Sequence, residues 1–115
     1  MKNDLRRSAG LVLGEHDFTS FAAVDPERSR QGEPIDNVRT IFSSEWERSG
    51  DEFVYTVRGS GFLHHMVRNL VGTFILVGGG TLQADDIHRI LEARNRSAAG
   101  ATAPAAGLYL VSVDY

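Results

Sequence analysis

Apolar residues recur at the spacing of an α-helix between residues 62 and 75, and this period constrains the fold more than any other feature. They fall in pairs one turn apart: Phe62/Leu63, Met66/Val67, Leu70/Val71 and Phe74/Ile75. A helix with this pattern buries a broad face. We therefore expect the segment to be the central helix of the domain.

The opposite face of this predicted helix carries Arg68, with His64 one turn behind it and Gly72 one turn ahead. His65 and Asn69 flank that line. A glycine inside a helix costs about 1 kcal/mol relative to alanine, so Gly72 suggests that another backbone or a ligand comes close. A guanidinium in such a place is suited to pair with a carboxylate or a phosphate. The alternative is a solvated arginine on a polar helix face.

The rest of the chain predicts a single α+β domain over residues 1–115, with helices packed on one face of an antiparallel sheet. The order is helix, hairpin, helix, helix, strand. The expected elements are a helix over 5–13, hairpin strands over 38–47 and 53–58, the central helix, a helix over 84–94 and a strand over 108–115. Ser60 is the predicted N-cap of the central helix, and the glycines at 78–80 are its predicted stop.

The predicted hairpin rests on alternation and on turn chemistry. Val38, Thr40, Phe42 and Trp46 are expected on one side of the first strand, and residues 49–51 (Ser-Gly-Asp) form the turn. Asp17 is placed to cap a helical turn that contains Phe18 and Phe21. The aromatic residues of these segments are expected mainly in the core.

Composition bounds the function. The chain has 115 residues, a net charge of −3 and no cysteine, which excludes thiol catalysis and disulfides and fits a reducing compartment. Residues 58–96 nevertheless hold five arginines against three carboxylates. This distribution permits an anion-binding face on an acidic protein.

Several common kinds of site are not expected. The adjacent His64 and His65 would point about 100° apart on a helix, so the two do not suit one metal ion. The glycines at 78–80 lack the Lys-Ser/Thr of a phosphate loop. The longest apolar run, residues 74–77, is far too short to span a membrane. We expect no metal site and no membrane partner.

Three long motifs resemble the tRNA pseudouridine synthase A family, and specifically the C-terminal half of its catalytic domain. They are Phe62-Leu-His-His-Met-Val-Arg-Asn-Leu-Val-Gly72, Gly14-Glu-His-Asp-Phe-Thr-Ser-Phe21, and Arg96-Ser-Ala-Ala-Gly-Ala-Thr-Ala-Pro-Ala-Ala-Gly-Leu-Tyr-Leu110 with Val113-Asp-Tyr115. Their order and spacing match the family, and together they span nearly the whole chain.

The resemblance implies an enzyme that isomerises uridine to pseudouridine in the anticodon stem-loop of tRNA, without cofactor, as a homodimer in the cytoplasm. In that family an aspartate attacks a flipped-out nucleotide, and Arg68 matches the arginine that pairs with this aspartate. The resemblance places His64, His65 and Asn69 near the RNA or the rim of the cleft. It places Leu108 at a strand that lines the uridine pocket.

One departure from the family is large. The family's catalytic aspartate lies in an N-terminal half, and nothing in this chain matches its motif. We therefore expect the isolated chain to be inactive and to need that N-terminal half as a partner. Two alternatives remain: a non-catalytic module that binds RNA or dimerises through an exposed sheet, and a small-ligand-binding domain.

Overall fold

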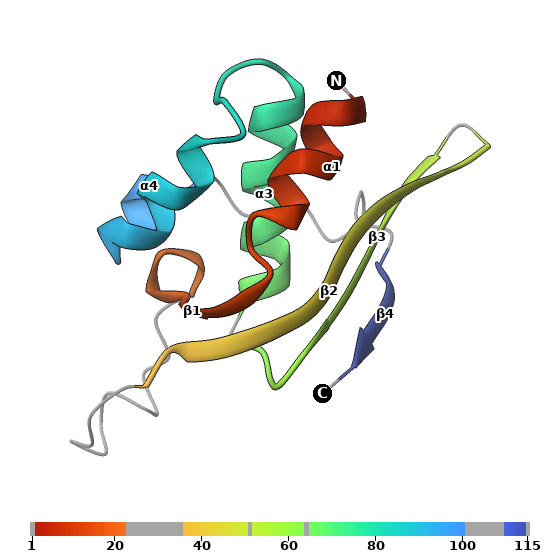
Figure 1. Cartoon of the computed structure of the whole chain (residues 1–115). Coiled ribbons are helices and arrows are strands. Elements are labelled where there is room, and N and C mark those ends of the chain that lie inside the picture. The colour runs from red at the N-terminus through yellow and green to blue at the C-terminus, as the bar shows by residue number, and fades with distance from the viewer. Residues whose placement is uncertain (1, 23–35, 51, 64, 101–109, 115) are drawn as a thin grey trace.

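A computed structural model describes residues 2–22, 36–50, 52–63, 65–100 and 110–114. In chain order the elements are α1 (Lys2–Gly10), β1 (Gly14–Asp17), the 3₁₀ turn η1 (Thr19–Phe21), β2 (Val38–Ser49), β3 (Glu52–Gly59), α3 (Met66–Gly78), α4 (Asp86–Ala93), the 3₁₀ turn η2 (Arg96–Ala98) and β4 (Leu110–Asp114). Figure 1 shows their arrangement.

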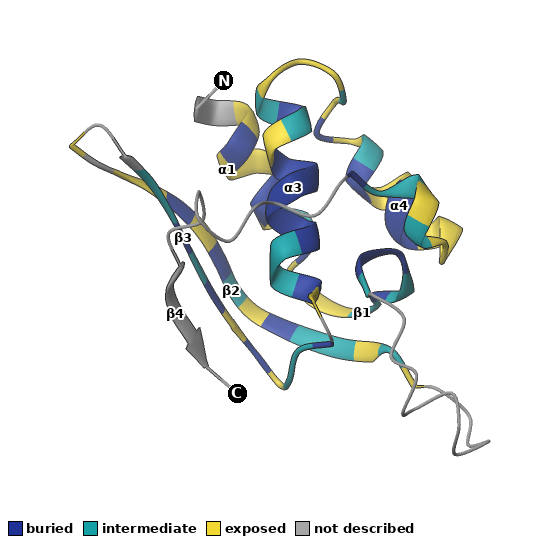
Figure 2. Ribbon diagram, turned by 180° about the vertical axis from the view of Figure 1, so that it is seen from behind, coloured by how far each residue is buried: buried dark blue, intermediate teal, exposed yellow. Residues whose placement is uncertain are grey.

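The domain has two layers. The strands form one sheet in the order β1-β2-β3-β4, and α1, α3 and α4 lie over the same face of it (Figures 1 and 2). No helix within the described ranges covers the other face. The predicted α+β class and the one-sided packing of the helices are confirmed.

Two features of the sheet differ from the prediction. The edge strand β1 was missed because its sequence, Gly-Glu-His-Asp, has no apolar alternation; it pairs with β2 through its backbone, from Gly14 opposite Ile41 to Asp17 opposite Val38. The last strand joins β3 in parallel, whereas β1, β2 and β3 are antiparallel to one another. A parallel neighbour requires a crossover connection, and α3 and α4 lie within it.

A β-bulge in β2 decides which of its residues enter the core. The pairing of β2 with β3 shifts between Ile41 and Ser43, so the side-chain alternation changes phase at that point. Ile41 and Trp46 are both buried, whereas Phe42 is 61% exposed. The expectation that Phe42 lies on the same side as Trp46 was wrong for this reason.

The central helix begins later than the apolar period suggests. Ser60 does not cap it: its hydroxyl oxygen accepts a hydrogen bond from the Thr40 N–H (3.0 Å) and ties the end of β3 to β2. The helix starts at Met66, after His65 in the left-handed conformation (φ 57°). At the other end, α3 stops at the glycines as predicted, with Gly80 at φ +86°.

Four further predictions concern the first helix, the hairpin turn, the cap of η1 and the inner face of α4. The first helix ends at Gly10, three residues before the predicted end. The hairpin turn is confirmed, because Ser49 pairs with Glu52. The cap at η1 is also confirmed, since Asp17 accepts a hydrogen bond from the Thr19 N–H (2.9 Å). The inner face of α4 is as predicted, with three buried residues: Ile87, Ile90 and Leu91.

Aromatic rings join α3 to the sheet. Phe74 of α3 lies edge-on to Trp46 of β2 and Tyr55 of β3, with ring centroids 6.5 and 5.5 Å away. Tyr55 is fully buried, and its hydroxyl shares a hydrogen bond of 2.7 Å with Ser44. Burial raises the pKa of Tyr55 well above its ordinary value, and the Ser44 hydrogen bond lowers it by a smaller amount.

The bulge predicts opposite consequences for two neighbouring substitutions. Ile41→Ala should lower the free energy of unfolding by about 2–5 kcal/mol because it opens a cavity in the core. Phe42→Ala should lower it by less than about 1 kcal/mol because that ring is in solvent. Urea unfolding of both variants measures the difference. A larger loss at Phe42 than at Ile41 would contradict the observed register.

Tyr55 predicts how stability responds to alkali. An unfolded tyrosine ionises near pH 10, whereas folded Tyr55 keeps its proton to higher pH. The stability that this proton provides is therefore fully present below about pH 10 and is lost as the pH rises further. Tyr55→Phe should flatten the decline in unfolding free energy between about pH 10 and about pH 12. Equal declines in the two proteins would refute this role.

Candidate functional site

Arg68 lies in the first turn of α3 and is partly buried. The helix starts only two residues before it, so Arg68 belongs to the end of α3 that follows β3, away from the turn of the β2–β3 hairpin (Figure 1). Gly72, one turn further, is buried. Ile75, seven residues after Arg68 and on the same face, is 50% exposed, so this face of α3 is covered at Gly72 and open to solvent further along the helix.

His65 is exposed at the start of α3, and its backbone holds the first turn of the helix. Its carbonyl accepts a hydrogen bond from the Asn69 N–H (2.9 Å) while its own φ is 57°. This conformation costs an ordinary residue about 1–2 kcal/mol relative to the right-handed region. His64 and Leu108, the other two predicted substrate contacts, lie outside the described residues.

The close approach predicted from Gly72 is made by the chain itself. The backbone of Gly100, just after η2, packs on α3: a Cβ built there would lie 3.1 Å from Thr73 Cα and 3.3 Å from the Gly72 carbonyl oxygen. It would also lie 2.7 Å from Leu76 Cδ1. Gly100 thus has no room for a side chain, and the backbone of Gly72 lies across from it.

Asn69 points into the protein. It is fully buried, its Nδ2 donates to the Phe21 carbonyl oxygen (2.7 Å), and its Oδ1 accepts from Arg96 Nη2 (3.1 Å). Both ends of its amide are therefore engaged inside the chain. Its predicted contact with a substrate stays a prediction, and the structure adds a second set of partners that sequence reasoning missed.

The residues around Asn69 come from all three of the sequence motifs. In chain order, Phe21 ends the first motif, Asn69 lies in the second, and Arg96 and Gly100 lie at the start of the third. Arg96 also donates to the Gly100 carbonyl oxygen through Nη1 (2.8 Å). The sequence signal for these contacts was that the residues belong to long motifs. Membership in a motif does not predict which residues contact each other.

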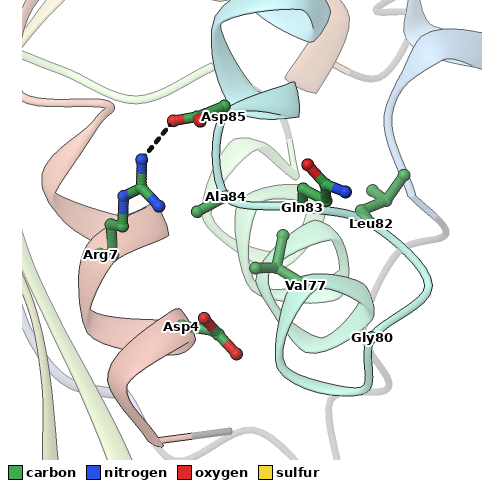
Figure 3. A pocket seen from close by; sticks show the side chains of 8 residues that line it. All are labelled: Asp4, Arg7, Val77, Gly80, Leu82, Gln83, Ala84 and Asp85. Carbon is green, nitrogen blue, oxygen red and sulfur yellow. Dashed lines mark hydrogen bonds and ion pairs between the residues drawn. The ribbon is translucent and has the colours of Figure 1, made fainter.

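A cavity of about 300 Å³ lies elsewhere, beside the other end of α3. Figure 3 shows the side chains that line it, and an ion pair of 2.6 Å between Arg7 Nη2 and Asp85 Oδ1 crosses it from α1 to the start of α4. Its α3 residue is Val77, more than two turns from Arg68. This cavity is therefore separate from the Arg68 end of the helix.

Two further observations concern the described part of the chain. It brings together no group of three or more histidine, aspartate or glutamate side chains that suits a metal ion. None of its helices is long and apolar enough to cross a membrane.

Comparison with known proteins identifies the family. Residues 9–115 match the family model described as tRNA pseudouridine synthase. The chain belongs to the tRNA pseudouridine synthase family. The match includes Arg68 and all three motifs.

Individual relatives agree with this assignment. The chain is 47% identical over 111 residues to tRNA pseudouridine synthase A of Bacillus pumilus (strain SAFR-032), covering 96% of this chain and 42% of the relative. It is 43% identical over 112 residues to the enzyme of that name from Bacillus subtilis (strain 168), covering 97% and 43%. The Solibacter usitatus (strain Ellin6076) relative is 55% identical over 102 residues, covering 89% and 38%. The chain thus spans about two fifths of the length of these relatives.

The left-handed backbone of His65 predicts an unusual response to glycine. His65→Gly should raise the free energy of unfolding by about 1 kcal/mol relative to His65→Ala, because glycine adopts positive φ without steric cost. At His88, which is exposed in the first turn of α4, glycine should instead be worse than alanine, by up to about 1 kcal/mol. Urea unfolding of the four variants gives both differences. The same sign at both sites would refute the assigned conformation.

Proposed function

We propose that this chain forms part of the catalytic domain of a tRNA pseudouridine synthase and isomerises uridine to pseudouridine in the anticodon stem-loop of tRNA. The observation that carries the proposal is the family match over residues 9–115, which includes the arginine at position 68. The nucleophilic aspartate comes from a portion of the enzyme that precedes the matched segment. The isolated chain is accordingly inactive.

Arg68 pairs with that aspartate. A guanidinium within hydrogen-bond reach lowers the pKa of a carboxyl group, so the aspartate stays ionised as a nucleophile must. The forked geometry of the guanidinium also fixes the direction of the carboxylate. The place of Arg68 in the first turn of α3 supports this role, because a side chain on a rigid helix aims its partner better than one on a loop. The reaction uses no cofactor.

The other predicted residues surround the nucleotide. His65 is exposed at the start of α3, three residues before Arg68, and lies near the RNA. His64 and Asn69 belong to the same segment, and Leu108 lines the pocket for the flipped-out uridine. The enzyme works on tRNA in the cytoplasm as a homodimer.

The N-terminal half of the synthase docks on the sheet face that the helices leave open. Val38 and Phe42 of β2 are 39% and 61% exposed, and large apolar side chains exposed along one strand are typical of a contact surface. The matched relatives are more than twice as long as the aligned segment. The rest of such a chain is covalently linked to this domain and can cover the open face. Self-association of the isolated chain through Phe42, measured by sedimentation, would instead favour the dimerisation module.

A chimera tests the function and the role of Arg68 together. In it, this chain replaces the matching portion of the Bacillus subtilis relative, and tritium release from labelled uridine in tRNA reports activity. Arg68→Ala should reduce the rate by about 100-fold or more, as the loss of an oriented charge in an active site usually does. Arg89→Ala is the matched control, since Arg89 is exposed on α4 and pairs across one turn of the same helix with Asp86 (3.5 Å).

Three outcomes are informative. Full activity of Arg68→Ala would refute the role of that residue. An inactive but folded parent chimera would refute the enzymatic function. Activity of the isolated 115-residue chain would refute the need for an aspartate from outside it.

A further inference from the structure

We propose that Arg96 and Asn69 are positioning residues that clamp residues 97–100 onto α3, next to the turn that carries Arg68. The proposal rests on the proposed function for its catalytic consequence. The clamp itself rests on contacts within the described residues.

The guanidinium of Arg96 bridges two elements. Nη1 donates to the Gly100 carbonyl oxygen (2.8 Å) and Nη2 donates to Asn69 Oδ1 (3.1 Å). One planar group thus joins the end of the 97–100 segment to the interior of α3. A lysine in this position keeps the charge but cannot reach both acceptors with a fixed fork.

Asn69 supplies a rigid acceptor for this fork. Its side chain is fully buried, and its Nδ2 donates to the Phe21 carbonyl oxygen (2.7 Å). Because a carbonyl can only accept and a guanidinium can only donate, only one orientation of the amide satisfies both neighbours. The Phe21 carbonyl therefore determines which way Asn69 Oδ1 faces, and through it where Arg96 lies.

Gly100 is held at both of its backbone polar groups. Its carbonyl accepts from Arg96, and its N–H donates to Thr73 Oγ1 (2.9 Å). The Thr73 hydroxyl in turn donates to the Asn69 carbonyl oxygen (3.0 Å). The lack of room for a Cβ at Gly100 adds a steric reason for the same placement. Two hydrogen bonds to Gly100, a third that holds Thr73 and a steric limit thus specify one position.

The start of the segment is anchored as well. Asn95 Oδ1 accepts from the Ser97 N–H (3.0 Å), which caps η2. The Asn95 N–H donates to Ser20 Oγ (2.9 Å), and that buried hydroxyl donates to the Ile90 carbonyl oxygen (2.6 Å). The segment is thereby fixed to η1 and α4 at one end and to α3 at the other.

The clamp lies beside the proposed catalytic arginine. Asn69 follows Arg68 directly, so the two side chains leave the same turn of α3 about 100° apart. Arg68 and the 97–100 segment therefore share one anchor, and loosening it should misplace one relative to the other without removing either.

The first test measures the clamp in the 115-residue chain without reference to activity. Arg96→Lys should accelerate hydrogen exchange of the Gly100 amide about tenfold, while amides of the α3 core such as that of Leu70 keep their protection. Thr73→Val, which removes the hydroxyl that accepts from Gly100, should do the same. Arg89→Lys is the control and should leave Gly100 unchanged. Unaltered Gly100 exchange in both test variants overturns the clamp.

The second test measures its catalytic consequence in the chimera. Arg96→Lys should lower the single-turnover rate on tRNA about tenfold while the Kd for tRNA changes less than about twofold, because misalignment within a formed complex affects the chemical step. Equal losses of rate and affinity, or a rate equal to that of the parent, overturn the positioning role. An inactive parent chimera overturns the proposed function and this role with it, whereas Gly100 exchange still decides whether the clamp exists.

Discussion

The arrangement of the domain depends on the need to bury α3 on nearly every side. Eight of its thirteen residues are buried, and they are spread around the helix axis. A helix of this kind cannot lie on a surface, so other elements have to surround it. The sheet covers one side through Phe74, α1 packs along another, and η1 closes a third. The one-sided placement of the helices in Figure 1 follows from this demand.

The buried polar groups of α3 select one arrangement of the segments that pack against it. Apolar contacts are non-directional and tolerate small displacements, whereas a buried amide that is left unpaired costs about 1–3 kcal/mol. Asn69 and Thr73 are fully buried and engage Phe21, Arg96 and Gly100. The segments before and after the central helix are therefore held in a defined register against it. Three motifs that are far apart in the sequence become one structural unit for this reason.

The sequence predicted those parts of the fold that depend on local pattern. The inner face of α4, the stop of α3 at its glycines and the hairpin turn at Gly50 all follow from periodicity or turn chemistry, and all are present. The bulge that exposes Phe42 does not follow, because one extra residue in a strand leaves no local signature. Nor does the late start of α3, since the apolar period continues through residues that are not helical. The partners of Asn69 lie far from it in the sequence and are brought to it by tertiary packing, so no local pattern predicted them.

Asn69, the residue after Arg68, fixes the backbone that carries the Arg68 side chain. Neighbouring residues on a helix point about 100° apart, so one turn of α3 presents Arg68 toward its partly exposed side and Asn69 toward the interior. The guanidinium is thus attached to a backbone that cannot rotate without breaking the bonds of Asn69 to Phe21 and Arg96. A charge that must aim a carboxylate benefits from this restraint, because a rigid donor loses little entropy when its partner arrives. The buried amide of Asn69 contacts no reacting atom in the proposed mechanism. It restrains the backbone from which the Arg68 side chain extends.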